Sequence, residues 1–596
     1  MSAGYSIPMP DLTGLPPEAG PVLQAMQQNQ PMVVVAGMVG VTPLTEAARR
    51  SLLAEVDTQD ALVRLATIQA KWDQASTTNW NLRPLHRELL TDASADWAPA
   101  VKAEVGRGNV FATPQVTVQL MRELLETEST ATRTLTSDEV VHLLISIATE
   151  QQTTSEFGSD VPTAAEVAAL DKKYQAMQPA DLIALSQEFL HHQAASSLFN
   201  APRKIECLKA DVVDFWYSPW ASRAHDSLGA SPAETFKDAT GITLDDFLRV
   251  GASLSDMITD GRTTVDLDDL AHDEQLRAFV SENMTLDLGG YRERLAADRA
   301  SGDVKLQRYT FTRYPFLDLG GGSLLILRAQ WATERFFGDT AQFDVMAAFA
   351  AKGDKKSANR FNDGMKYQFE DIVGATLGRI AARSRRVEKL VSEPAMQEQW
   401  TEKKGEKPSV CDWALRAGPV TILVDATHHP LNATLAQGLG NGALYDADSD
   451  LILTEGKFQQ FASVMRLIRR LGFAGQPDPN AVFVPFVVVP NSGTPSSMLT
   501  ELDYGQRAKE VFAEFQGRVA RPTVLQLQEL QLLEGIGDHL HLDSVSFLCE
   551  WRKFPMPLSL QEFLELQGKP QPISKHILKA AKQLDRRLQG RDSEAA

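Results

Sequence analysis

The uninterrupted apolar run at residues 482–489, Val-Phe-Val-Pro-Phe-Val-Val-Val, constrains the fold of this chain most strongly. Continuous apolar character over this length is typical of a strand that is buried on both faces of a sheet. Two further strands are predicted at residues 410–414 and 420–424, with Ala417-Gly418-Pro419 as the turn between them. We therefore expect an α/β module in this part of the chain.

Helical patterns surround these strands. A helix that opens at Gly364 places its apolar residues on one face, and a second helix is predicted to run to about Met396. Another helix is predicted from Lys457 to Arg470. The predicted order is therefore helix, strand, strand, helix, strand.

Two acidic residues occupy special positions in the predicted hairpin. Asp412 opens one strand, and Asp425 lies deep in the next. This spacing can bring two carboxylates to one edge of a sheet, where they would suit a divalent cation. The alternatives are that Asp412 is a cap or turn residue and that Asp425 is a strand-end acid before the turn at His428-His429-Pro430.

The element order and the acids together resemble the PD-(D/E)XK nuclease superfamily, which has the restriction-endonuclease-like fold. In that family, a glutamate on the first helix, an aspartate at the start of the second core strand and an acid-x-lysine on the third converge on magnesium. Glu370 matches the helix acid, Asp412 the motif aspartate and Asp425 the second acid. Thr427 stands where the lysine is expected. Some members move the lysine to the following helix, which carries Lys457 here.

The resemblance covers about residues 360–495. It implies that Glu370, Asp412 and Asp425 hold Mg²⁺ or Mn²⁺ and that Lys457 joins them as a catalytic residue. The implied function is a decayed or atypical metal-dependent phosphodiesterase in bacterial DNA processing or phage defence. Because threonine cannot replace the charge of lysine, the alternative is a non-catalytic scaffold or protein-interaction protein that retains the nuclease-like fold.

The remainder of the chain is predicted to be mainly helical, so the fold class is mainly α with a central restriction-endonuclease-like α/β module in a multidomain protein. A capping box begins a helix at Thr136, and a similar start occurs at Thr163. Alternating residues predict a strand at 308–314, followed by a triple-glycine turn and a second strand at 323–327. The predicted regions are a partly disordered lead-in at 1–43, helical domains at 44–300, a hairpin-containing segment at 301–349, the nuclease-like module at 350–495 and a C-terminal helical region at 496–596.

Charge and composition limit the possible partners. The net charge of -18 should repel polyanions over most of the surface, but residues 350–407 hold 13 Lys/Arg against 9 Asp/Glu. This basic stretch could contact DNA or RNA, or it could simply be a solvated helix and loop. A protein partner could bind the helical domains instead.

The sequence predicts no membrane-spanning segment, because its apolar runs fall short of the roughly 20 residues that a spanning helix needs. The 3 cysteines match no disulfide or zinc framework, which favours a reducing cytoplasm. The adjacent His191 and His192 show no partner at metal-ligand spacing, so a surface or core role is predicted for them.

Overall fold

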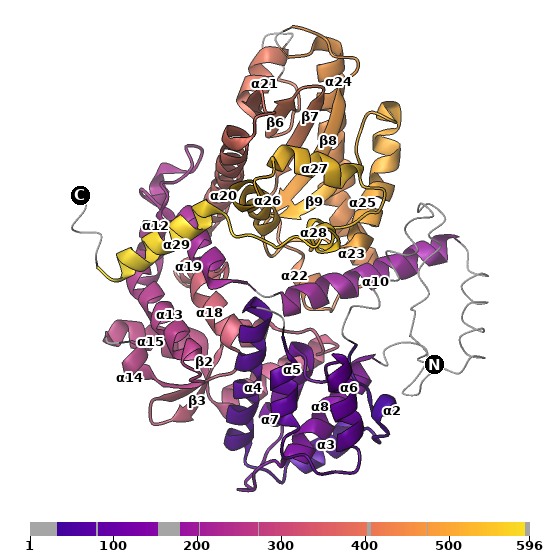
Figure 1. The fold of residues 1–596 in the computed structure, drawn as a ribbon. Coiled ribbons are helices and arrows are strands. Elements are labelled where there is room, and N and C mark those ends of the chain that lie inside the picture. The colour runs from indigo at the N-terminus through magenta and orange to yellow at the C-terminus, as the bar shows by residue number, and fades with distance from the viewer. Residues whose placement is uncertain are drawn as a thin grey trace.

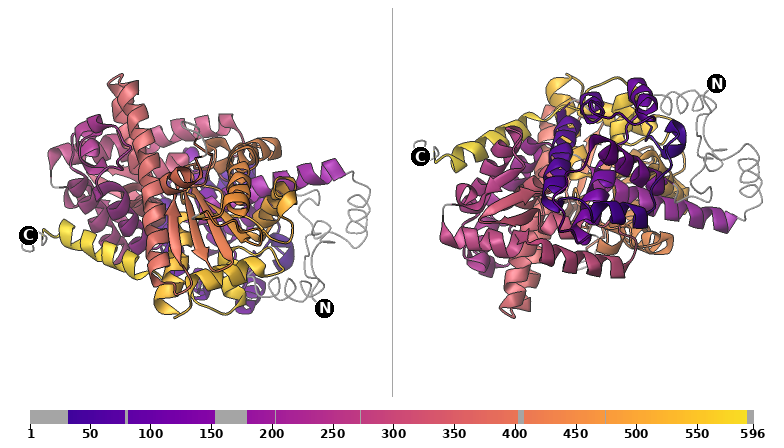
Figure 2. Two further views of the ribbon diagram at one scale, coloured as in Figure 1. Left: turned by 90° about the horizontal axis from the view of Figure 1, so that it is seen from above. Right: turned by 90° about the horizontal axis from the view of Figure 1, so that it is seen from below.

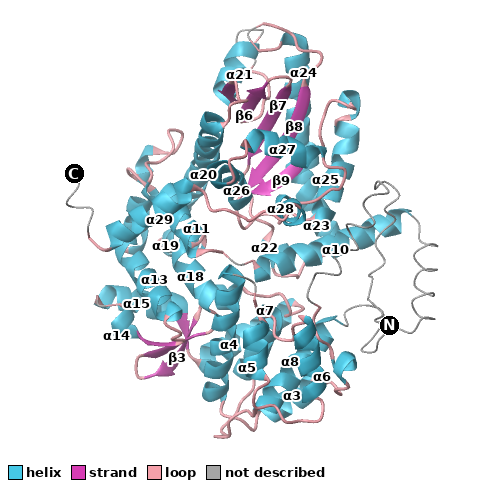
Figure 3. Cartoon of the chain, in the orientation of Figure 1, coloured by secondary structure: helices cyan, strands magenta, loops and turns pink. Residues whose placement is uncertain are grey.

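The computed structural model describes residues 32–78, 81–152, 179–201, 203–271, 273–401, 407–473 and 475–590. This part of the chain is mainly helical and contains two small mixed sheets (Figures 1 and 3), which confirms the predicted class at this coarser level. None of the described helices combines the length and the hydropathy needed to cross a membrane. Residues 1–31 of the predicted lead-in, and the helix start at Thr163, lie outside the described residues.

The N-terminal helices pack around a core of their own. They are α2 (Ala36–Val39), α3 (Glu46–Leu53), α4 (Thr58–Thr78), α5 (Arg83–Leu89), α6 (Ala98–Arg107), α7 (Pro114–Glu126) and α8 (Ser137–Gln152). Residues at the end of the predicted lead-in join this core, since Val34 and Val39 are buried and the Ala36 amide donates to Thr149 Oγ1 at 2.8 Å. The predicted capping box is present, with the Thr136 amide 2.8 Å from Glu139 Oε2 and the Glu139 amide 3.2 Å from Thr136 Oγ1.

A second helical region follows and carries the smaller sheet. Its helices are α10 (Pro179–Asn200), α11 (Ile205–Val212), η1 (Val213–Tyr217), η2 (Asp226–Leu228), α12 (Pro232–Thr240), α13 (Leu244–Thr259), α14 (Leu267–Leu270), α15 (Glu274–Met284), α16 (Leu288–Ser301), α17 (Tyr309–Arg313), α18 (Ala329–Phe337) and α19 (Thr340–Ala351). Its strands are β1 (Thr264–Asp266), β2 (Thr285–Leu286), β3 (Phe316–Gly320) and β4 (Ser323–Ile326). In the sheet they lie side by side in the order β1-β4-β3-β2.

The predicted hairpin is present, but its first strand begins later than expected. The stretch predicted as a strand at 308–314 contains helix α17, and β3 follows it. Phe311 and Tyr314 are three residues apart, so a helical turn directs both toward the N-terminal core, where both are buried. Gly320, Gly321 and Gly322 form the turn with φ of 90°, 65° and 86°, a region that residues with a Cβ rarely adopt.

The larger sheet forms the centre of the C-terminal half. Its strands are β5 (Lys389–Ser392), β6 (Trp413–Ala417), β7 (Val420–Ala426), β8 (Val482–Val489) and β9 (Thr523–Gln526), and they lie in that order. Strands β5, β6 and β7 are antiparallel, whereas β7, β8 and β9 are parallel. The apolar run at 482–489 is β8, as predicted. The predicted helix to Met396 is wrong over β5, and the C-terminal region contributes β9 in addition to helices.

Helices cover both faces of this sheet. The helices of this half are α20 (Lys355–Arg383), α21 (Glu393–Trp400), α22 (Ala433–Ala436), α23 (Gly442–Ser449), η3 (Asp450–Lys457), α24 (Phe458–Leu471), α25 (Met498–Val511), η4 (Ala513–Phe515), α26 (Leu527–His539), α27 (Ser544–Lys553), α28 (Leu560–Leu566) and α29 (Lys575–Leu588). Ile422 and Val424 pack toward α20 and α26, whereas Leu423 packs toward α24 and α25. Figure 2 shows α20, in salmon, running beside the strands.

Candidate functional site

Asp412 and Asp425 lie opposite each other at one end of the larger sheet, where β6 begins and β7 ends. Trp413 pairs with Val424 in the antiparallel β6–β7 ladder, so the preceding and following residues, Asp412 and Asp425, also face each other. The Asp425 side chain is fully buried, and Asp412 Oδ2 accepts the Ala426 amide at 2.7 Å. The register of the hairpin therefore produces the pair of carboxylates that the sequence predicted.

The proximity of the two aspartates links their ionisation. Burial raises the pKa of Asp425, and the neighbouring Asp412 carboxylate raises it further. Burial also raises the pKa of Asp412, against the opposing effects of the Ala426 amide and Lys457. Because metal ligands must be deprotonated, a bound cation would favour the charged forms of both carboxyl groups.

Lys457 forms a close ion pair with Asp425. This lysine ends η3 and directly precedes α24, the helix that covers the Leu423 face of the sheet. Asp425 follows Leu423 by two residues and belongs to the same face, as does Thr427. The ammonium group of Lys457 therefore contacts Asp425, the acid beside which the strand lysine was expected. The pKa of Lys457 is raised by the Asp425 carboxylate, despite the opposing effect of burial.

Glu370 lies on α20, which covers the other face of the sheet, and Arg223 holds it in a close ion pair. The Arg223 guanidinium also lies 4.7 Å from the centre of the Tyr367 ring. Burial and the Asp412 carboxylate raise the pKa of Glu370. Arg223 belongs to the loop between η1 and η2, and sequence reasoning missed it because 147 positions separate it from Glu370.

Glu393 is a fourth acid of the cluster that the sequence did not indicate. It begins α21 directly after β5, and its amide donates to the Asp412 carbonyl at 2.7 Å. Burial and the Asp412 carboxylate raise its pKa, while Arg223 and Lys457 oppose that rise. No spacing in the sequence marks this residue, and the predicted helix to Met396 obscured the short strand at residues 389–392 that precedes it.

The aspartate pair suits a hard cation, since Mg²⁺ is commonly held by one or two carboxylates together with water. The expected third ligand does not converge on the pair. Among the described residues, the three carboxylates Glu370, Asp412 and Asp425 do not form a group whose oxygens all lie within 4.8 Å of one another. Glu370 instead remains with Arg223 on the α20 side.

A different group does have ligand atoms within 4.8 Å of one another, namely Glu188, His191 and His192 of α10. Glu188 Oε1 lies 3.7 Å from His191 Nδ1 and 3.2 Å from His192 Nε2, so the sequence expectation that these histidines lack a nearby ligand partner is wrong. The partner occurs one helical turn earlier in the chain. Nitrogen ligands suit zinc better than magnesium, so this group is not the magnesium site that the resemblance implies.

Internal ion pairs neutralise part of the positive charge of residues 350–407. Arg379 and Arg383 both contact Glu534 on α26, at 2.8 and 3.0 Å. Lys355, Lys356 and Arg385 are exposed and remain available to an anionic partner.

Comparison with known proteins gives no relative for this chain: no family model, no curated protein and no solved structure matches it. Any function must therefore be argued from the cluster itself.

Proposed function

We propose that the larger sheet carries a divalent-metal site for phosphodiester hydrolysis, with Asp412 and Asp425 as the metal ligands. The observation that carries the proposal is the contact of Lys457 with Asp425 beside Asp412, because two acids and an ammonium group meet at one sheet edge. The strand arrangement supports it. After α20, Asp412 precedes the second strand and Asp425 lies on the third, as in the PD-(D/E)XK pattern.

A bound Mg²⁺ or Mn²⁺ would supply a polarised water and would offset charge on the phosphate. Lys457 holds a positive charge beside that position, because its partner Asp425 raises its pKa. This ammonium group takes the role that Thr427 cannot fill, which is to stabilise negative charge developing on the phosphate oxygens. Glu393 is a further acid beside the pair, whereas Glu370 is neutralised by Arg223.

The exposed lysines of the basic stretch would hold the nucleic-acid backbone. Lys355 and Lys356 lie at the first turn of α20, the helix that carries Glu370. A DNA or RNA strand bound there would lie along the helix that borders the acid cluster. Neutralising these two lysines as glutamine should weaken nucleic-acid binding and reduce its dependence on salt.

The experiment is a cleavage assay on single- and double-stranded DNA and RNA with Mg²⁺ or Mn²⁺. We expect metal-dependent cleavage by the wild type, loss of cleavage in Asp412→Asn/Asp425→Asn, and a hundred- to thousandfold lower rate, on the order seen for a lost oxyanion donor, in Lys457→Gln. Asp363→Asn is the matched control, since this exposed acid of α20 forms an ion pair with Lys366 at 3.0 Å. Equal cleavage by the wild type and the double variant would refute the assignment of the aspartates.

A non-catalytic scaffold is the second candidate, and the ion pairs favour it. Arg223 neutralises Glu370 and Lys457 neutralises Asp425, so the cluster has internal cations of its own. Under this alternative, no metal dependence is expected, and the double variant should bind any partner as the wild type does.

A further inference from the structure

A second site lies at the opposite end of the larger sheet, around a cavity of about 370 Å³. Its floor is formed by Val420, Val482 and Val484, at the beginnings of β7 and β8, and by Ala520. These valines share the sheet face of Ile422 and Val424, so the cavity lies on the α26–α27 side. The acid cluster, in contrast, lies where β7 ends and β6 begins. The cavity is therefore separate from the proposed metal site.

Cations surround this apolar floor. Arg518, Arg521, Arg552 and Lys553 line the cavity, and its lining contains no acidic side chain. Of these four, Arg552 is paired with Glu501 at 2.8 Å. Arg518 contacts Asn480 at 3.2 Å rather than a carboxylate. In a chain with a net charge of -18, a cavity with three cations lacking a carboxylate partner among the described residues is a strong local exception.

Two buried N–H groups at this cavity have no acceptor among the described residues. They belong to Arg521 Nε and Arg552 Nη1, and Arg552 is only 3% exposed. Arg521 also donates a hydrogen bond to the Met556 carbonyl at 3.0 Å, and Arg552 donates one to the Arg521 carbonyl at 2.9 Å. Carbonyl contacts therefore hold both arginine side chains in place at the cavity wall.

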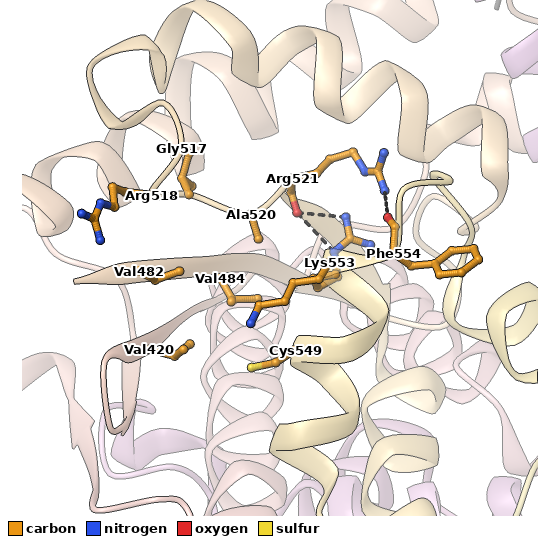
Figure 4. A pocket seen from close by; sticks show the side chains of 12 residues that line it. Val420, Val482, Val484, Gly517, Arg518, Ala520, Arg521, Cys549, Lys553 and Phe554 are labelled. Atoms are coloured by element: carbon orange, nitrogen blue, oxygen red, sulfur yellow. Dashed lines mark hydrogen bonds between the residues drawn. The ribbon is translucent and has the colours of Figure 1, made fainter. Parts of the chain in front are cut away.

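The clustered cations favour an anionic ligand at this cavity. Burial lowers the pKa of Arg521 to about 10, and the adjacent Arg552 guanidinium adds to this effect while Glu501 opposes it. Figure 4 shows the Lys553 side chain extending beside Val484 and above Cys549. Lys553 is exposed, so its ammonium group can meet a ligand without a large desolvation cost.

We propose that this cavity binds a small organic phosphate, in which a phosphate monoester meets Lys553 and the arginines while an apolar or flat body lies on the valine floor. The surplus of cations favours a dianionic phosphate over a singly charged carboxylate. The cavity volume is in the range of small-molecule sites, roughly 300–1,000 Å³. Nucleoside monophosphates belong to this class and supply the probe.

The test is calorimetric titration of the full chain with adenosine 5′-monophosphate, inorganic phosphate, adenosine and hexanoate. We expect the monophosphate to bind most tightly, phosphate more weakly, and adenosine and hexanoate weakest. Lys553→Gln should weaken monophosphate binding at least tenfold, and Arg518→Gln should weaken it less. Lys509→Gln, at an exposed lysine of α25, is the matched control and should bind as the wild type does.

Cys549 provides a readout confined to this cavity. It lines the cavity and is half-buried, whereas Cys411 is fully buried. Bound monophosphate should slow alkylation of Cys549, as followed by mass spectrometry of the peptide that contains it, and should leave alkylation of Cys207 unchanged. The proposal is overturned if adenosine or hexanoate binds as tightly as the monophosphate, if Lys553→Gln binds normally, if Cys549 is not protected, or if neither phosphate probe binds at millimolar concentration. The Asp412→Asn/Asp425→Asn variant should retain this binding, which separates the result from that for the metal site.

Discussion

The ammonium group of Lys457 contacts the carboxyl group of Asp425, a side chain that is completely buried, while Lys457 itself is 24% exposed. The lysine thus connects a buried acid on β7 with solvent at the start of α24. The pair determines both the charge and the proton occupancy of the cluster, and it is the source of the first two predictions.

Replacing Lys457 with methionine should destabilise the protein more at pH 8 than at pH 5. Without the ammonium group, the pKa of Asp425 rises above its wild-type value of about 8, so the variant keeps the proton where the wild type ionises, and the additional loss of stability appears as pH approaches 8. We expect a loss of about 1–3 kcal/mol at pH 8, below the range for a fully buried pair because Asp425 can take up a proton. Urea unfolding at the two pH values measures this, with Lys509→Met as control. An equal loss at both pH values would contradict it.

Metal binding should strengthen as pH rises and should release a proton. The pKa values of Asp412 and Asp425 are both raised, so a carboxyl group that is protonated near neutral pH must lose its proton before a cation can hold both carboxylates. Between pH 6 and 8, we expect Mn²⁺ affinity to rise by up to about tenfold per pH unit for each proton released. Titration calorimetry in two buffers of different ionisation enthalpy counts the proton. Asp425→Asn should bind more weakly and release none, and pH-independent binding by the wild type would contradict proton release from the aspartates.

Replacing Arg223 with glutamine should increase Mn²⁺ affinity severalfold, with little change in stability. The variant removes the cation that neutralises Glu370 and therefore makes the cluster more negative. Arg223 is 49% exposed, so its ion pair should contribute less than about 1 kcal/mol to the free energy of unfolding. Arg360→Gln, which removes a contact to Ser227 at 3.0 Å, is the matched control. A fall in Mn²⁺ affinity would show instead that Arg223 orders the site.

Glu529→Gln should stabilise the protein, increasingly so as pH rises from 4 to 8. Burial raises the pKa of Glu529 to about 8, so the wild-type folded state holds a proton that the unfolded chain loses near pH 4.3, about the usual value for glutamate. The wild type therefore loses stability across this window, whereas glutamine cannot ionise. Glutamine can still accept the Gln526 amide, which lies 2.9 Å from Glu529 Oε2.

We expect the difference in unfolding free energy to reach about 1–3 kcal/mol at pH 8, measured by urea unfolding. Glu562→Gln, in the capping box of α28, controls for removing a carboxylate from such a box. A difference that does not grow with pH would show that Glu529 is ionised at low pH.

The parts of the fold that the sequence predicted are those with local signals. The uncharged run of β8 has no helical alternative that fits its length, and the β6–β7 turn contains Gly418 at a φ of 61°. The short edge strand β5 was missed because its four residues carry no periodicity and begin with an exposed lysine. Pairing with β6, at positions more than twenty residues later, is what makes it a strand.

The residues of the candidate site also differ in whether the sequence predicts them. Asp412 and Asp425 were predictable together because the hairpin register relates them. Arg223 and Glu393 were not, since one arrives from a distant loop and the other from the unpredicted β5–α21 connection. Their signal is tertiary proximity, which no spacing within the sequence records.

One apolar cluster extends from Leu208 to Leu584 and includes Phe361 and Phe369 of α20 together with Val424 of β7. A fragment cut near residue 350 would therefore expose the α20 face that packs against Trp216 and Trp220, whose rings lie 6.2 and 5.9 Å from Phe361. The sheet and its acids cannot be excised as a self-sufficient unit. Transfer of this module to another protein would have to include the helices that pack against it, because they share one apolar core with the sheet.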